Sequence, residues 1–134
     1  MVSLVIFDCD GVLVDSERLS HEVLQEMLCE LGVSLDFDQT VERFIGTSLP
    51  VCMQRVADLT ARPLPERFQS QFAARTRLRF EQELGVVAGV EDVLDSLACA
   101  YCVASNGNRA KVDFTLGHTR LLARFNGRIF SADD

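Results

Sequence analysis

A short apolar run that ends in two carboxylates constrains this chain more than any other feature. The residues from Val2 to Phe7 are almost all apolar, and Asp8, Asp10 and Gly11 follow directly. An apolar run of this length is typical of a strand buried on both faces, as in a parallel sheet. The sequence therefore predicts a buried first strand whose carboxyl end carries Asp8 and Asp10.

Helical patterns dominate the next part of the chain. Apolar residues recur at helical spacing from Ser16, which has the character of a helix cap, to Gly32. Three more helices are expected, one near 38–45, one that begins at Ser48 and one that begins at Pro65. Because Gly and Pro cluster at both ends of this region, we assign 16–84 to a separate, all-helical insert.

The last part of the chain returns to strands. A short helix at 90–97 precedes an apolar strand at 100–104, and one helix that begins around Arg109 leads to a strand at 128–130. This alternation predicts an α/β fold in which parallel strands are joined by right-handed crossovers. Ligands of such sheets bind at the carboxyl ends of the strands. We assign 1–15 and 85–134 to this core.

Charge and composition exclude several classes of protein. Thirteen Lys and Arg oppose twenty Asp and Glu, and the resulting charge of −7 repels nucleic acid and anionic membranes. No apolar run is long enough to span a bilayer, and no basic region precedes the first strand as in a secretion signal. We therefore expect a cytoplasmic protein with neither a nucleic-acid partner nor a membrane partner.

Two strand ends carry groups that suit phosphoryl chemistry. Asp8 and Asp10 follow the first strand, and Ser105 and Asn106 follow the second. Two close carboxylates repel each other unless a cation or a shared proton relieves them. Mg²⁺ takes oxygen ligands and bridges to a substrate phosphate, so Asp8 and Asp10 are the candidate metal ligands.

Each of these residues has an expected role. Asp8 would attack phosphorus and form an aspartyl phosphate, while Asp10 would protonate the leaving oxygen and later activate water. Ser105 and the Asn106 amide would hold the phosphoryl oxygens. Gly11 would let the backbone turn close to the ligand.

Other interpretations of these motifs remain open. Either motif alone is common turn material. Asp8, Asp10, Gly11 and Glu17 also match the later part of an EF-hand calcium loop, but Ile6 occupies the position of its leading carboxylate. Five scattered cysteines argue against a disulfide framework, and the pair Cys99 and Cys102 falls in an expected strand, where a redox pair is uncommon.

The two motifs together resemble a known family. DCDGVLVDS at 8–16 resembles the first motif of the haloacid dehalogenase superfamily, and VASNG at 103–107 resembles its second. The helical insert is similar to the small cap of the subgroup that contains phosphoglycolate phosphatase, β-phosphoglucomutase and sugar-phosphate phosphatases. The resemblance implies a Rossmann-like core, Asp8 as nucleophile and Mg²⁺ ligand, Asp10 as acid/base with a metal-binding backbone carbonyl, and Ser105 as phosphate ligand.

The same resemblance leaves the exact activity open. We expect a phosphatase for a small phosphorylated metabolite, a sugar or sugar-acid phosphate, because Leu49 stands where the mutase has a phosphate-binding Arg. The alternatives are a phosphosugar mutase and a catalytically silent binding or assembly module.

The chain also departs from the family at its end. The family's later Lys and acidic metal ligands have no counterpart, and Lys111 and 133–134 are interpreted as solvated surface charges. We therefore expect the 134-residue chain to be C-terminally truncated and nearly inactive alone. The first strand would then have an open apolar edge that favours self-association.

Overall fold

The structure is a computed structural model that describes residues 1–134 and contains two compact units. One unit joins 1–17 to 80–134, and the other contains 18–79. The sequence placed the helical insert at 16–84, whereas the contacts place its boundaries at 18 and 79. Each unit is described by itself.

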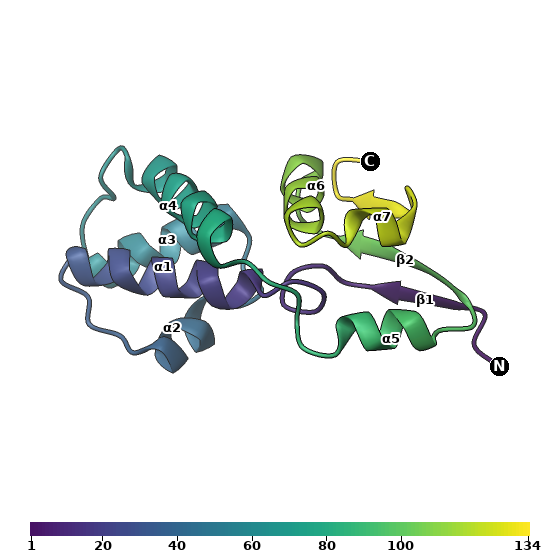
Figure 1. The fold of residues 1–134 in the computed structure, drawn as a ribbon. Helices are drawn as coiled ribbons and strands as arrows, with labels where there is room; N and C mark the ends of the chain where they lie inside the picture. The colour runs from purple at the N-terminus through teal and green to yellow at the C-terminus, as the bar shows by residue number, and fades with distance from the viewer. The chain divides into compact units, whose positions relative to one another are not determined.

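A three-stranded parallel sheet organises the first unit (Figure 1). Its strands are β1 (Leu4–Phe7), β2 (Ala100–Ser105) and β3 (Ile129–Ser131), in the order β1-β2-β3. Val5 lies opposite Tyr101, and Val103 lies opposite Ile129. The α/β fold expected from the sequence is confirmed.

One face of the sheet is covered by α6 (Arg109–His118) and α7 (Leu122–Phe125). Contacts join α6 to β3 and α7 to β2. The fully buried ring of Phe125 meets Phe7 and Tyr101 edge-on, with ring centroids 6.2 and 5.4 Å apart. Such edge-to-face contacts stabilise a core beyond the area they bury.

The other face of the sheet is largely exposed. Leu4 is 48% exposed, Ile6 is 62% exposed and Phe130 is 55% exposed. The prediction that the first strand is buried on both faces is therefore wrong, because the face of β1 that carries Leu4 and Ile6 is exposed. β1 is also an edge strand of this sheet, because it pairs only with β2.

The helix around Arg109 also differs from expectation. One helix was predicted between Arg109 and the last strand, but α6 ends at His118 and α7 begins at Leu122. Arg120 has a φ of 64°, which an α-helix does not allow. Leu116 and Leu121 are nevertheless both buried, so the break redirects the chain without exposing its apolar residues.

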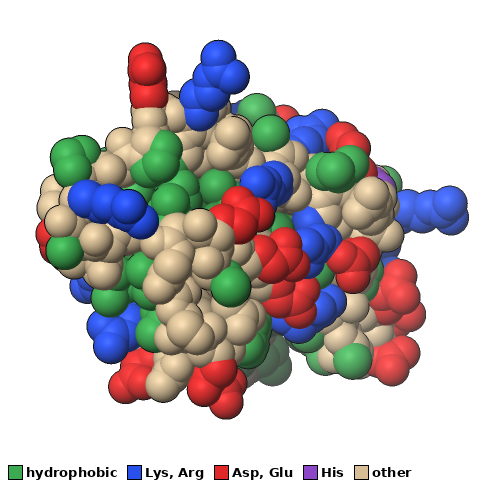
Figure 2. All heavy atoms as spheres, turned by 90° about the vertical axis from the view of Figure 1, so that its left-hand side faces the viewer, with side chains coloured by type: hydrophobic (Ala, Val, Ile, Leu, Met, Phe, Trp, Pro, Cys, Tyr) green, Lys and Arg blue, Asp and Glu red, His purple; other side chains and the backbone are tan.

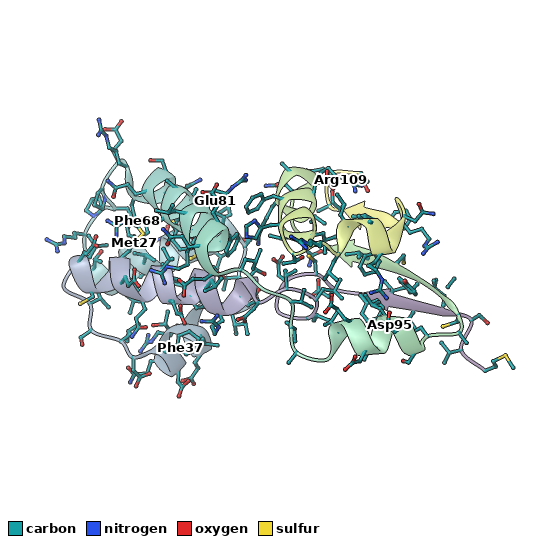
Figure 3. The ribbon with its side chains drawn as sticks, in the orientation of Figure 1. Met27, Phe37, Phe68, Glu81, Asp95 and Arg109 are labelled. Atoms are coloured by element: carbon teal, nitrogen blue, oxygen red, sulfur yellow. The ribbon has the colours of Figure 1, made fainter.

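The helical unit contains most of α1 (Ser16–Glu30), together with α2 (Phe37–Phe44), α3 (Leu49–Thr60) and most of α4 (Phe68–Glu83). Ser48 caps α3 through Val51, as its position in the sequence predicted. Figure 3 labels Met27 on α1 and Phe68 on α4. They belong to a core that also contains Val23, Leu24, Leu28, Phe44, Cys52 and Val56.

Ion pairs join α1 to α4 on the surface of this unit. Arg79 lies 2.8 Å from Glu26, and Arg75 lies 2.6 Å from Glu30. Figure 2, which shows the side that lies on the left in Figure 1, has acidic and basic side chains interleaved. Exposed pairs of this kind each contribute only about 0–1 kcal/mol, so the apolar core carries the stability of the unit. No helix in the chain has the length and apolarity that crossing a membrane requires.

Candidate active site

A tight turn follows β1 and shapes the first half of the site. The N–H groups of Leu13 and Val14 both donate to the carbonyl of Cys9, and the Gly11 N–H donates to the carbonyl of Val14 at 2.8 Å. Gly11 has a φ of 74°, and a Cβ there would lie 2.9 Å from the Glu17 side chain. Only glycine fits this position without strain.

The turn is fixed to the returning chain by an antiparallel bridge. The Asp15 N–H donates to the Gly85 carbonyl, and the Val87 N–H donates to the Leu13 carbonyl, both at 3.0 Å. Leu13 is completely buried. These bonds hold the residues between β1 and α1 in one arrangement.

Asp8, Ser105 and Asn106 line one cavity. It has a volume of about 400 Å³ and lies where β1, β2 and β3 end. The remaining lining residues are Ala104, Phe130, Ser131 and Ala132. The structure therefore brings the expected nucleophile together with the two expected phosphate ligands, as parallel pairing of the strands requires.

Ser105 is prepared to donate a hydrogen bond. Its side chain is buried, and its Oγ accepts the N–H of Gly107 at 3.0 Å. Because that bond uses a lone pair of the oxygen, the hydroxyl proton is still available for an anionic ligand.

Asp10 points toward the same strand end. A Cβ atom on Gly107 would lie 3.7 Å from Oδ2 of Asp10 and 3.3 Å from Oγ of Ser105. Oδ1 of Asp10 instead accepts a 2.6 Å hydrogen bond from the Ser16 hydroxyl. Asp10 thus belongs to the site, although neither it nor Gly11 lines the cavity around Asp8.

Two residues at the site were missed by sequence reasoning. Ser16 was interpreted only as a helix cap, and Lys111 only as a solvated surface charge. The second interpretation is wrong, because Nζ of Lys111 lies 3.2 Å from Oδ1 of Asp10. The sequence did contain a signal for the position of Lys111. Asn108 caps α6 soon after β2 ends, so the first turn of the helix, which contains Lys111, must lie near the strand ends.

The acidic residues at the end of the chain hold the first residue of α6, a contact that their interpretation as solvated charges did not include. Oδ2 of Asp133 accepts the N–H of Arg109 at 2.7 Å, and Asp134 pairs with the Arg109 guanidinium. The hydrogen bond from the Arg109 guanidinium lowers the pKa of Asp134. Figure 3 labels Arg109 at the beginning of α6, the element that these carboxylates hold.

Cys9 separates the two aspartates but takes no part in acid or nucleophile chemistry. Burial raises the pKa of this thiol to about 11, while its contact with Thr115 partly offsets the effect. A neutral, buried thiol is a poor nucleophile and a poor metal ligand. Asp8 and Asp10 are therefore the groups beside this strand end that suit a hard cation.

The oxygen donors at this strand end suit a Mg²⁺ ion that is held by only a few protein ligands. No group of three or more His, Cys, Asp or Glu side chains that could hold a metal is present. Mg²⁺ is commonly bound by one or two carboxylates, with waters and substrate phosphate completing the shell. Asp8, which is exposed at the cavity, provides a carboxylate for such a site, and Asp10 would contribute its backbone carbonyl, as the family resemblance implies.

Residues 5–134 match the haloacid dehalogenase-like hydrolase family, and the chain belongs to this family. The chain is 30% identical to 6-phosphogluconate phosphatase of Escherichia coli K12 over 134 residues, which cover 99% of this chain and 61% of that protein.

Solved structures show the same relationship. A haloacid dehalogenase-like protein of unknown function from Agrobacterium tumefaciens has a TM-score of 0.91 at 30% identity, over 100% of this chain and 60% of that one. A putative β-phosphoglucomutase from Thermotoga maritima shares the fold, with a TM-score of 0.75 at 21% identity, over 98% of this chain and 62% of that one. The chain thus spans about three fifths of the length of these proteins.

Proposed function

We propose that this chain carries the nucleophile and phosphate-binding elements of a magnesium-dependent phosphatase for a small phosphorylated metabolite. The observation that carries the proposal is the common cavity of Asp8, Ser105 and Asn106 at the carboxyl ends of adjacent parallel strands. The substrate class, a sugar or sugar-acid phosphate, is supported by similarity to 6-phosphogluconate phosphatase.

The proposed reaction has two steps. A carboxylate oxygen of Asp8 attacks phosphorus while the bond to the ester oxygen breaks, and Asp10 gives its proton to that leaving oxygen. Water then attacks the aspartyl phosphate, and Asp10 takes the proton of this water as phosphate leaves Asp8.

The other groups hold the phosphoryl oxygens during both steps. The Ser105 hydroxyl and the Asn106 amide would donate to them. When bound by Asp8 and Asp10, Mg²⁺ supplies charge neutralisation that lets an anionic nucleophile approach an anionic ester.

The test is release of inorganic phosphate from a panel of sugar and sugar-acid phosphates in the presence of Mg²⁺. The complete encoded protein and the 134-residue chain are assayed in parallel. We expect turnover by the complete protein, little by the 134 residues alone, and a loss of at least about 10³-fold in Asp8→Asn. Undiminished turnover by Asp8→Asn would remove the mechanism, and an isomerised ester without free phosphate would indicate a mutase.

A phosphoenzyme assay separates catalysis from silent binding. The complete protein is mixed with Mg²⁺ and beryllofluoride, a mimic of the aspartyl phosphate, and is observed by ¹⁹F NMR. Bound fluoride resonances that disappear in Asp8→Asn support the proposal. Their absence in the parent protein favours a binding or assembly module.

Self-association through the open edge of β1 is a separate proposal about partners. Unpaired N–H and C=O groups on an edge strand form a template for a second strand. The exposed side chains of Leu4 and Ile6 add apolar area beside this edge. The occupant proposed here is a second copy of this chain.

The cytoplasmic setting stays a prediction.

A further inference from the structure

Lys111 occupies an unusual place among the basic residues of this chain. Thirteen residues are Lys or Arg, and Lys111 is the only lysine among them. Its backbone N–H donates to Oδ1 of Asn108, so its position in the first turn of α6 is fixed by the helix cap. Its ammonium group lies 3.2 Å from Oδ1 of Asp10.

The two oxygens of Asp10 have different surroundings. Oδ1 accepts a 2.6 Å hydrogen bond from the Ser16 hydroxyl, and the Lys111 ammonium forms an ion pair with the same oxygen at 3.2 Å. Oδ2 is directed to the end of β2, where a Cβ on Gly107 would lie 3.7 Å from it and 3.3 Å from the Ser105 hydroxyl. Oδ2 is therefore the Asp10 oxygen found beside the hydroxyl that is expected to bind phosphate.

We propose that Lys111 is a positioning residue that fixes Oδ1 of Asp10, so that Oδ2 is the oxygen which exchanges protons with the substrate. This inference rests on the proposed function, because it assigns the working atom of the proposed acid/base. Lys111 acts through Asp10 and has no role in binding the phosphoryl group.

The chemistry of lysine suits this arrangement. An ammonium group is a compact charge that can share one carboxylate oxygen with a hydroxyl, whereas an arginine fork favours both oxygens of a carboxylate. Arginine at this position would compete for Oδ2. The pair is also partly exposed, with side-chain exposures of 41% for Lys111 and 17% for Asp10, so its contribution to stability is small.

A single lysine permits a direct test of the contact in the 134-residue chain. Reductive ¹³C-methylation labels only Nζ of Lys111 and the α-amine of Met1, and it keeps the positive charge. We expect Asp10→Asn to shift the dimethyl-Lys111 resonance. The control Asp113→Asn, which removes an exposed carboxylate of α6, should leave the resonance in place. An amide fingerprint spectrum verifies that each variant is folded. An unchanged resonance in folded Asp10→Asn would overturn the contact.

The positioning role is tested by leaving-group dependence in the complete encoded protein. An alkyl phosphate needs protonation of its leaving oxygen, whereas p-nitrophenyl phosphate has a good leaving group and needs it far less. Lys111→Met should lower kcat for the alkyl ester by about 10- to 100-fold, and kcat for p-nitrophenyl phosphate by less than about twofold, with KM unchanged for both. The control Arg124→Met removes an ion pair with Asp95 in the same unit and should affect neither ester.

The alternative outcomes point to different failures. Equal losses on the two esters, or a rise in KM, would overturn the positioning role, because Lys111 would then bind phosphate or support the fold. Absence of turnover by the parent protein on both esters would overturn the proposed function instead, while the NMR experiment still reports whether Lys111 holds Asp10.

Discussion

The hydroxyl of Ser16 donates a 2.6 Å hydrogen bond to Oδ1 of Asp10 and thereby ties the first turn of α1 to the carboxylate that follows β1. Ser16 is buried and Asp10 is half-buried, so water does not readily replace this bond. A hydrogen bond to a charged group contributes more than one between neutral groups. The orientation of the proposed acid/base therefore depends on the first residue of α1.

Removal of the Ser16 hydroxyl should impair catalysis. We expect Ser16→Ala to lower kcat for an alkyl phosphate by about tenfold, because Asp10 loses one of the two groups that hold Oδ1. Ser16→Thr keeps a hydroxyl and should retain most of the activity. Ser34→Ala, at an exposed loop position, serves as the control. Steady-state kinetics checks the prediction, and parent-like kcat in Ser16→Ala would contradict it.

A methyl group on Gly107 should weaken phosphate binding. The new Cβ would lie 3.3 Å from Oγ of Ser105 and would crowd the hydroxyl that is expected to hold phosphate. We expect Gly107→Ala to raise the inhibition constant of inorganic phosphate by about tenfold. Gly117→Ala is the matched control, because its nearest neighbour is a Leu122 side-chain carbon at 3.9 Å. Equal inhibition constants in the two variants would argue against Ser105 as the phosphate ligand.

Two buried thiols should make the protein less stable at alkaline pH. Burial raises the pKa values of Cys9 and Cys52 from an ordinary value of 9.0 to about 11. Between these values the unfolded chain loses protons that the folded chain retains, so the free energy of unfolding falls as pH rises from about 9 to 11. The expected loss is about 2 kcal/mol per thiol. Below pH 9 both thiols stay protonated in either state, and this contribution is fully present.

Urea unfolding at pH 8, 9.5 and 10.5 measures this effect. Between pH 8 and 10.5 the free energy of unfolding should fall less for Cys9→Ala than for the parent protein, whatever the stability of the variant at pH 8. Cys29→Ala, which removes an exposed thiol, should decline as the parent does. Identical declines in all three proteins would show that the buried thiols are not responsible.

A charge on the open edge strand should prevent self-association. Ile6 is 62% exposed on β1, and a lysine there would place charge beside any strand that pairs with this edge. We expect sedimentation velocity to show a concentration-dependent dimer for the parent chain and a monomer for Ile6→Lys. Val93→Lys alters an exposed apolar residue of α5 (Val90–Ser96) and should leave the dimer intact. A monomeric parent chain would end the proposal of self-association.

Local signals predicted most of the secondary structure. Ser48 marks the start of α3, and the polar residues after β2 mark the end of a strand, because caps and turn residues act within a few positions of themselves. The break between α6 and α7 was not predicted, since Leu116 and Leu121 both look like helical core positions. The chain buries both leucines through a turn at Arg120, and contacts join α6 to β3 and α7 to β2.

The exposure of β1 shows a second limit of sequence reasoning. The apolar run from Leu4 to Phe7 predicts a strand correctly, but it does not reveal which of its faces another element covers. Coverage of a face depends on which elements pack on it, and α7 packs on the face of β1 that carries Phe7. The apolar pattern therefore identified the strand, while the placement of the helices decided which of its faces is exposed.

The sequence alone determined the α/β class and the pair of strand ends that carry Asp8, Asp10 and Ser105, because periodicity and turn chemistry are local. Only the tertiary structure decided that Lys111 lies on Oδ1 of Asp10 and that Oδ2 faces the end of β2. These contacts join residues far apart in the chain. They depend on the register of β1 against β2 and on the direction in which α6 leaves the sheet. Neither of these features produces a recognisable pattern in the local sequence.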